Sequence, residues 1–242
     1  MIGLLGAMEE EISLMKASME IKEVVSQARM KYYVGTLGEQ EVILLQTGIG
    51  KVNAAIGTQI MIDRFDVDKI VMTGLAGALM PNLRRGDIVV ANSVVQYDFD
   101  LTAFGRRYGE LPDVGRTIEV DQKLVKYACY AFDDVFKGTS DPPLLVVGTV
   151  ISGDRFVTNP SQIEWLQREF GAVATEMEGA AVGYTCHLND VPFMLIRTIS
   201  DTGGVGATDD FEDYLKSASN NSFQIVSSML KLAGVTEDAH TI

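Results

Sequence analysis

The chain has 242 residues, of which 47% are hydrophobic and 22% charged, and its formal net charge at pH 7 is −13. This is the composition of a globular protein with enough apolar material for a core. The acidic excess repels phosphate backbones, and no run of 18 apolar residues exists, so we expect neither a nucleic-acid nor a membrane partner.

The start of the chain is apolar but carries no basic segment, and it leads directly into Glu9, Glu10 and Glu11. This pattern is not that of a signal peptide. The two cysteines do not suggest a disulfide framework, which fits reducing conditions. We therefore expect a cytoplasmic protein.

Short apolar runs alternate with helical spacing along the whole chain, which is the pattern of an α/β fold with a largely parallel sheet. We expect strands at residues 2–5, 24–35, 42–46, 70–73, 88–94, 144–150, 173–175 and 193–199. We expect helices at about residues 10–19, 52–65, 122–136, 160–168, 179–188 and 211–232. No linker divides the chain, so a single domain over residues 1–242 is predicted, with polar residues 236–242 disordered.

Glycines or acidic residues follow several predicted strands. They occupy residues 6–11, 74–77, 176–178 and 200–201. In open α/β sheets, ligands bind at the carboxyl ends of the strands. Small residues there allow the backbone to approach a ligand closely. We therefore expect these segments to converge on one site.

Phosphate-loop, dinucleotide and metal motifs are not supported. Gly48-Ile49-Gly50-Lys51 lacks the earlier glycine and the following Ser or Thr of a phosphate loop. The chain has only two histidines, and His187 follows Cys186 directly on a predicted helix, so their side chains diverge. We expect no metal and no cofactor.

Carboxylates remain as the candidate catalytic groups. Glu9, Glu10 and Glu11 stand at the start of a predicted helix, where the helix dipole stabilises acidic side chains. A structural role is therefore the commoner interpretation of such a run. Glu176 and Glu178 flank a methionine directly after a strand, and Asp201 follows another. Arg197 lies inside an apolar strand and needs an anionic partner. It either closes a structural ion pair or orients a catalytic carboxylate, and the sequence leaves both open.

Seven motifs occur in order over nearly the whole chain, from residue 2 to about residue 232. They are Gly6-Ala7-Met8-Glu9-Glu10-Glu11, Thr47-Gly48-Ile49-Gly50-Lys51, Thr73-Gly74-x-Ala76-Gly77, Leu101-Thr102-Ala103-Phe104-Gly105, Ser152-Gly153-Asp154-x-Phe156, Glu176-Met177-Glu178-Gly179-Ala180 and Arg197-x-x-Ser200-Asp201. Together they resemble the 5′-methylthioadenosine/S-adenosylhomocysteine nucleosidases of the nucleoside phosphorylase/hydrolase superfamily.

The resemblance implies a three-layer α/β/α fold with a mixed central sheet, nucleoside phosphorylase-like, and a homodimer. It implies hydrolysis of the N-glycosidic bond of both nucleosides, releasing adenine and thioribose, in methionine salvage and removal of methyl-cycle by-products. Catalytic roles fall on Asp201, as the acid facing N7 of adenine, and on Glu11, which would activate the water. Glu178 would bind the ribose hydroxyls.

Further substrate contacts are implied residue by residue. Phe156 would stack on the base, the backbone of Val157 would read its edge, and Met177 would lie against the sugar. Leu101 and Phe104 would reach into the partner subunit's pocket. The full set implied to bind substrate is Met8, Ile49, Ala76, Gly77, Phe156, Val157, Glu176, Met177, Glu178, Arg197, Ser200, Phe211, Leu101 and Phe104.

The reaction itself calls for such groups. Cleavage passes through a positively charged sugar and an adenine anion, so one acid must stand by the purine and a base must activate water on the opposite face. Each role is worth roughly 10²–10⁴ in rate. To act as an acid near neutral pH, Asp201 needs a raised pKa.

Two positions depart from the family pattern. Leu75 stands where serine is common, and Arg106 stands where an aromatic residue often follows Phe-Gly. They leave the group at the 5′ carbon open, so a futalosine-type nucleoside remains an alternative. Purine phosphorolysis and a non-catalytic binding protein are further alternatives. Residues 202–207 are either a lid over the substrate or a plain connector.

Overall fold

A computed structural model describes residues 1–203 and 207–238. The strands are β1 (Ile2–Gly6), β2 (Glu20–Gln27), β3 (Met30–Leu37), β4 (Gln40–Gln46), β5 (Lys69–Ala78), β6 (Ile88–Gln96), β7 (Ile118–Glu119), β8 (Leu145–Ser152), β9 (Ala174–Glu176) and β10 (Phe193–Asp201). The helices are α1 (Glu9–Ser18), α2 (Lys51–Phe65), α3 (Gln122–Val135), α4 (Pro160–Phe170), α5 (Gly179–Leu188) and α6 (Ala207–Asp238), with a short 3₁₀ helix η1 (Thr102–Phe104).

The strands form one mixed sheet in the order β10-β6-β8-β9-β5-β1-β4-β3-β2, and β7 pairs with β6. β10 also pairs with β5, so the strands β5, β9, β8, β6 and β10 close into a ring. β2, β3 and β4 extend the sheet beyond β1 as an antiparallel edge. The mixed sheet agrees with the predicted fold class, whereas the closure of the ring is not predicted.

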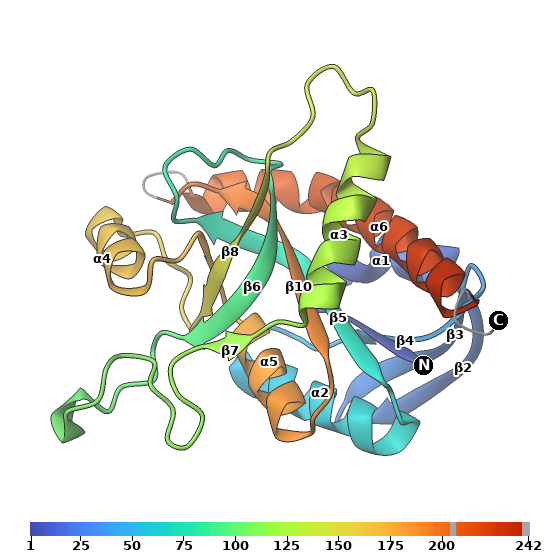
Figure 1. Ribbon diagram of the computed structural model, residues 1–242, viewed down its shortest axis with the longest axis horizontal. Helices are drawn as coiled ribbons and strands as arrows, with labels where there is room; N and C mark the ends of the chain where they lie inside the picture. The colour runs from blue at the N-terminus through green and yellow to red at the C-terminus, as the bar shows by residue number, and fades with distance from the viewer. Residues whose placement is uncertain (204–206, 239–242) are drawn as a thin grey trace.

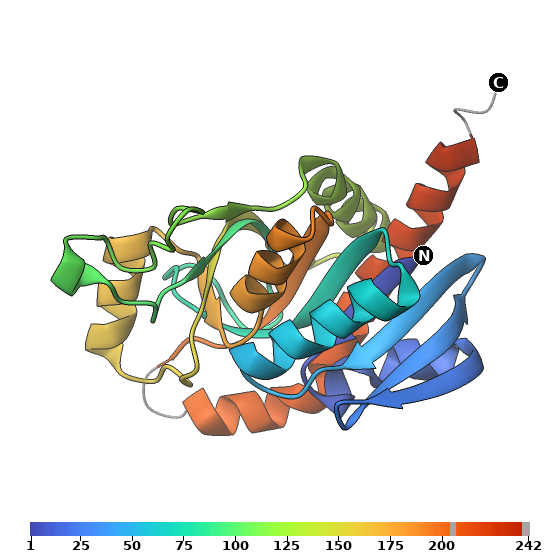
Figure 2. The same cartoon turned by 90° about the horizontal axis from the view of Figure 1, so that it is seen from below.

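Helices cover both faces of this sheet. α2 and α5 contact each other on one face, and α6 contacts α1 and α3 on the other. Figure 1 shows α2 and α5 below the sheet and α6 running above it, and Figure 2 shows the same molecule from below. The three-layer α/β/α arrangement is therefore confirmed. Within the described residues, no helix is both long and apolar enough to cross a membrane.

The strand expected at residues 24–35 is wrong, because the chain forms a hairpin there. β2 and β3 are antiparallel and are joined at Ala28 and Arg29, whose φ angles are 50° and 62°. Two consecutive left-handed residues form the tight turn that matches the twist of paired strands. Neither residue is a glycine or asparagine, so the sequence carries no turn signal.

Other boundaries shift toward the site. The expected strands at residues 70–73 and 193–199 continue to Ala78 and Asp201, because β5 and β10 pair along their whole length. The glycine-containing segment 74–77 therefore lies within a strand and does not follow one. The last helix begins at Ala207 and continues to Asp238, so the expected start at 211 and end at 232 are both too short. Residues 204–206 of the expected lid and residues 239–242 of the expected disordered tail lie outside the described residues.

Candidate active site

A cavity of about 300 Å³ opens where β1, β5, β9 and β10 end. It brings together segments from the whole length of the chain, as the strand-end pattern predicts. Its described lining residues are Ala7, Met8, Glu11, Ile49, Leu75, Ala76, Gly77, Arg155, Phe156, Val157, Thr175, Glu176, Met177, Glu178, Ser200, Asp201 and Phe211.

Glu11 enters the cavity from the first turn of α1 and is 6% exposed. Its Oε2 accepts hydrogen bonds from the backbone N–H groups of Ala7 (2.6 Å) and Met8 (3.0 Å), and its Oε1 accepts one from Leu75 (2.9 Å). Burial raises the pKa of this carboxyl, and Arg197 and the backbone donors oppose the rise. Three backbone donors therefore fix the Glu11 carboxyl at the wall of the cavity.

Arg197 and Glu176 form a buried ion pair beneath the cavity. Arg197 is 0% exposed, and its Nη1 also donates to the backbone oxygen of Thr73 at 2.9 Å. A side chain at position 74 would collide with the guanidinium, so Gly74 is required for the close approach of β5 to β10. Burial alone would lower the pKa of Arg197, but Glu176, Glu11 and Glu178 raise it.

Ser152, at the end of β8, holds Glu176 from the other side. Its hydroxyl donates to Glu176 Oε1 and accepts from the backbone N–H of Ala180 at 2.7 Å. Glu176 also accepts from the N–H groups of Glu178 (3.1 Å) and Gly179 (2.8 Å). These bonds fix the sharp turn from β9 into α5, and that turn delivers Glu178 to the cavity.

Glu178 lies between Arg197, at 3.7 Å, and the N–H of Gly50, which donates to its Oε1 at 2.7 Å. Burial first, and then the neighbouring charge of Glu176, raises the pKa of Glu178 to about 8. Three carboxylates, Glu11, Glu176 and Glu178, therefore share one buried guanidinium. Because one cation does not balance three anions in a buried site, the neighbouring negative charges favour the protonated form of Glu178.

Asp201 closes the other side of the cavity at the end of β10 and is 2% exposed. Its Oδ2 accepts from the hydroxyl of Ser200 at 2.8 Å, and its Oδ1 accepts from the N–H of Gly203 at 3.0 Å. A Cβ at position 77 would lie 3.2 Å from Oδ1, so Gly77 leaves room beside the carboxylate. The arrangement holds an acid in a fixed orientation next to a glycine-lined space.

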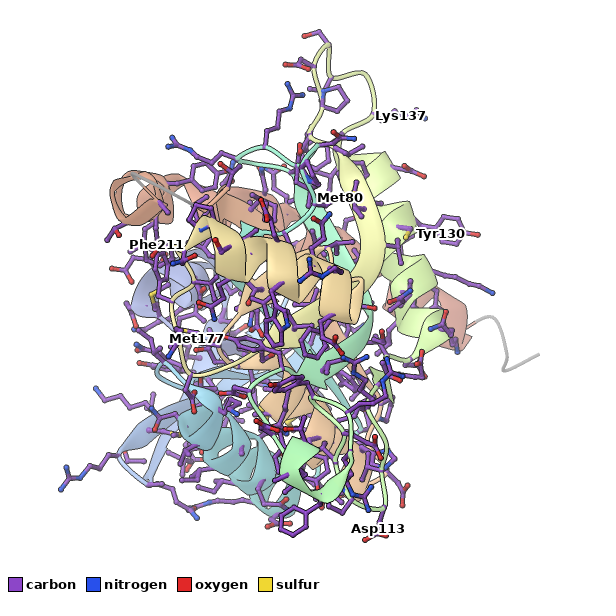
Figure 3. The ribbon with its side chains drawn as sticks, turned by 90° about the vertical axis from the view of Figure 1, so that its left-hand side faces the viewer. Met80, Asp113, Tyr130, Lys137, Met177 and Phe211 are labelled. Carbon is purple, nitrogen blue, oxygen red and sulfur yellow. The ribbon has the colours of Figure 1, made fainter. Side chains whose placement is uncertain are left out.

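Aromatic and apolar side chains form the mouth of the cavity. The rings of Phe156 and Phe211 meet edge to face with centroids 5.5 Å apart, and Phe156 is 42% exposed. Met177 and Phe211 lie on the same side of the molecule (Figure 3). A half-exposed aromatic ring at a cavity mouth offers a stacking surface for a flat ligand.

Three of the residues implied to contact substrate do not line this cavity. Arg197 lies beneath the carboxylates and pairs with Glu176, so the ion pair considered from the sequence is present. Orientation of a catalytic carboxylate by Arg197 stays a prediction. Leu101 and Phe104 lie in a segment that projects away from the sheet (Figures 1 and 2), and Phe104 is 81% exposed. Their implied place is the pocket of a partner subunit.

Sequence reasoning missed several residues of the site. Ala7, Arg155 and Thr175 line the cavity, and Ser152 anchors Glu176 from behind. Ser152 stands in one of the seven motifs, which was the only signal that could have found it. Over residues 1–203 and 207–238, no group of three or more His, Cys, Asp or Glu side chains is arranged to hold a metal ion.

Comparison with known proteins defines the class first. Residues 1–231 match the family model described as the Phosphorylase superfamily. Among curated relatives, the 5′-methylthioadenosine/S-adenosylhomocysteine nucleosidase of Staphylococcus haemolyticus is 39% identical over 96% of this chain and 100% of its own length. That of Geobacillus thermodenitrificans is 38% identical over 94% of each chain. The chain belongs to the 5′-methylthioadenosine/S-adenosylhomocysteine nucleosidase family.

Solved structures agree with this assignment. The Neisseria meningitidis nucleosidase in complex with methylthio-immucillin-A matches with a TM-score of 0.90, at 36% identity over 95% of this chain and 98% of that one. The Colwellia psychrerythraea enzyme in complex with adenine also matches at 0.90, with 37% identity over 95% of this chain and 94% of that one. A Helicobacter pylori structure described as futalosine hydrolase matches at 0.89, with 33% identity over 95% and 97%.

Proposed function

We propose that this chain hydrolyses the N-glycosidic bond of 5′-methylthioadenosine and S-adenosylhomocysteine, releasing adenine and the thioribose. The reaction serves methionine salvage and the removal of methyl-cycle by-products. The observation that carries the proposal is that Glu11, Glu178 and Asp201, from three distant parts of the sequence, line one cavity of nucleoside size. Family membership supports the same reaction.

Each carboxylate takes one task in this mechanism. Asp201 donates a proton to N7 of the adenine, which makes the base a better leaving group. Glu11 holds and deprotonates the attacking water, and its raised pKa suits a base that works near neutral pH. Glu178 binds the 2′ and 3′ hydroxyls of the ribose and stabilises the positive charge that develops on the sugar.

The remaining contacts orient the substrate. Phe156 stacks on the base, the backbone of Val157 reads its edge with Ala76, Gly77 and Ser200 nearby, and Met177 lies against the sugar. The 5′-thio group lies among Met8, Ile49 and Phe211. Glu176 and Arg197 act through Glu178, because both are buried in the network that holds it.

Hydrolysis is favoured over phosphorolysis by the charge of the site. A phosphate dianion needs unpaired cations, whereas Glu11 presents a carboxylate and the guanidinium of Arg197 is paired with Glu176. Arg155 is the basic residue among the described lining residues, and it neighbours the stacking Phe156. Adenine release in phosphate-free buffer tests this directly, and a strict requirement for phosphate would contradict it.

The substrate range is tested by comparing turnover of methylthioadenosine, S-adenosylhomocysteine, 5′-deoxyadenosine and inosine without phosphate. We expect the adenine nucleosides to be cleaved and inosine to be spared. A futalosine-type nucleoside belongs in the same assay, because one solved structure similar to this chain is described as futalosine hydrolase. A much higher kcat/KM for it than for methylthioadenosine would reassign the substrate.

The role of Asp201 is tested by Asp201→Asn. The amide keeps the size of the side chain but has no acidic proton to give, so we expect turnover to fall by roughly 10²–10⁴ while substrate still binds. Retention of more than about a tenth of the wild-type rate would reject the acid role.

The chain is proposed to act in the cytoplasm as a single domain, without a cofactor, and as a homodimer. Exposed apolar side chains support a second copy as the partner: Phe104 is 81% exposed, Val52 is 68% exposed and Ile56 is 42% exposed. Sedimentation of the wild type and of a Phe104→Asp, Val52→Asp double variant tests the assembly. A wild type that sediments as a monomer at micromolar concentration would reject it.

A further inference from the structure

Three charged residues lie together beside the lining residues Ile49 and Arg155 and have no part in the proposed chemistry. Lys51 begins α2, Asp98 follows β6, and Asp154 follows β8; we call them the rim cluster. Asp154 Oδ1 accepts from the backbone N–H of Lys51 at 2.8 Å, and Asp98 Oδ2 accepts from the N–H of Asp154 at 3.0 Å. The ammonium of Lys51 closes the cluster on Asp98 Oδ1 at 2.5 Å. Three loops are thereby joined.

The rim cluster supplies a cap that α2 lacks from its own sequence. The N-cap residue of α2 is Gly50, which has no side chain to accept the free N–H groups of the first turn. Two carboxylates from elsewhere do so: Asp154 accepts from Lys51, and Glu178 accepts from Gly50 at 2.7 Å. One helix terminus therefore holds both carboxylates, and the helix dipole favours their negative charge.

The two capping carboxylates belong to segments that contact opposite halves of a bound nucleoside in the proposed mechanism. Asp154 stands two residues before Phe156, and the intervening loop is tight, because the N–H of Arg155 donates to the oxygen of Gly153 at 2.7 Å. Glu178 is the carboxylate that faces the ribose in the proposed mechanism. The start of α2 therefore sets the distance between the residue that stacks on the base and the residue that binds the sugar.

We propose that Asp154 is a positioning residue: by capping α2 from the base-binding loop, it fixes Phe156 relative to Glu178, and Lys51 and Asp98 hold it in place. This inference rests on the proposed function. The ion pair of the cluster is partly exposed, at 17% for Lys51 and 33% for Asp98, so it contributes little to stability. Position matters more, because a displacement of about 1 Å between binding groups can cost 10²-fold in rate.

A positioning role predicts different effects on the nucleoside and on free adenine. A nucleoside spans both halves of the site, so its reaction depends on their relative placement, whereas adenine occupies only the base half and makes no contact with Glu178. Loss of the cap is expected to lower kcat/KM for methylthioadenosine by about 10- to 100-fold. The inhibition constant of adenine is expected to change by less than about threefold, since the base loop keeps its own residues.

The experiment compares Asp154→Ala and Asp154→Asn with Asp121→Ala in the full chain. Asp121 caps α3 by accepting from the N–H groups of Lys123 and Leu124, each at 2.9 Å, and does not line the cavity. Both alanine variants lose a helix cap, so both are expected to lower Tm. Only Asp154→Ala is expected to lose kcat/KM, and Asp154→Asn is expected to recover most of it, because its amide oxygen still accepts from Lys51.

Equal kcat/KM for Asp154→Ala and Asp121→Ala would overturn the positioning role, and so would an equal loss of adenine binding and nucleoside turnover in Asp154→Ala. A wild type that releases no adenine would reject the proposed function instead. Amide hydrogen exchange of the ligand-free protein then tests the positioning role independently of the reaction. Asp154→Ala is expected to speed exchange in residues 48–51 and 153–157 together, and unchanged exchange in either segment would reject the linkage.

Discussion

Glu178 is held from two sides that differ in their exposure to water. On the buried side, Arg197 is 0% exposed and Glu176 lies against it. On the rim side, Gly50 donates to Glu178 from a helix terminus that the partly exposed Lys51, Asp98 and Asp154 hold in place. Ion pairs in the two regions contribute differently to stability, because a buried charge must be paired whereas an exposed charge is already solvated.

The buried side is expected to determine whether the site folds. Arg197→Met removes the one cation among Glu11, Glu176 and Glu178. Breaking a buried pair in this way costs about 3–5 kcal/mol, a large part of a typical stability of about 5–15 kcal/mol. Urea denaturation measures the loss, and turnover is expected to disappear with it.

The matched control for that prediction is Arg106→Met. Arg106 pairs with Glu110 at 2.9 Å, but the two side chains are 41% and 29% exposed. The loss expected there is about 0–1 kcal/mol. If Arg197→Met were no more destabilising than this control, burial would not be what distinguishes the two regions.

Ser152 offers a smaller change within the buried region. Ser152→Ala keeps the fold of β8 but leaves Glu176 without its hydroxyl donor and the N–H of Ala180 without its acceptor. Leaving a buried polar group unpaired costs about 1–3 kcal/mol. We also expect a lower kcat for methylthioadenosine, because the turn that carries Glu178 loosens, and Ser152→Thr is expected to restore part of it. An unchanged kcat would limit Ser152 to a structural role.

The pH dependence of stability gives a third comparison. The folded protein raises the pKa of Glu178 from 4.5 to about 8, chiefly through burial, and the pKa of Glu11 rises as well. Between these values the folded state keeps a proton that the unfolded state has released, so the stabilisation present below pH 4.5 is lost as the pH rises toward 8. The charged groups facing Glu178 are Glu176, Glu11 and Arg197.

Thermal unfolding of the ligand-free protein measures this effect. We expect Tm to fall as the pH rises from about 5 to about 8, and we expect the fall to be shallower in Glu178→Gln, whose amide does not titrate. A wild-type slope in Glu178→Gln would show that the proton is held elsewhere.

The sequence was enough to locate most of this site but not its supports. Glu11, Glu178 and Asp201 could be found because each follows or ends an apolar run, and strand ends converge in this class of fold. Ser152, Asp98 and Asp154 could not be assigned roles in the same way. Their function lies in contacts with residues 24 to 103 positions away, and local spacing does not encode such contacts.

The same limit explains the errors in the fold. Ala28 and Arg29 adopt left-handed conformations that tertiary pairing imposes on ordinary residues, so the β2–β3 hairpin left no turn signal. The closure of β10 on β5 joins strands that lie more than 110 residues apart. The alternation of strands and helices predicts the layers, whereas register and closure depend on which long-range pairs form.

Salt is expected to give the smallest effect and the sharpest contrast between the two regions. At 1 M ionic strength the Debye length is about 3 Å, so the exposed attraction between Lys51 and Asp98 is screened, while the pair of Arg197 and Glu176 lies out of reach of the ions. KM for methylthioadenosine should therefore rise by a few-fold between about 0.1 and 1 M sodium chloride, with Tm nearly unchanged. Lys51→Met has no ammonium to screen, so its KM should start higher and respond less to salt. If its KM responded as strongly as that of the wild type, the salt would be acting on the substrate or on the buried charges. The role of Lys51 and Asp98 in holding the exposed side of Glu178 would then be rejected.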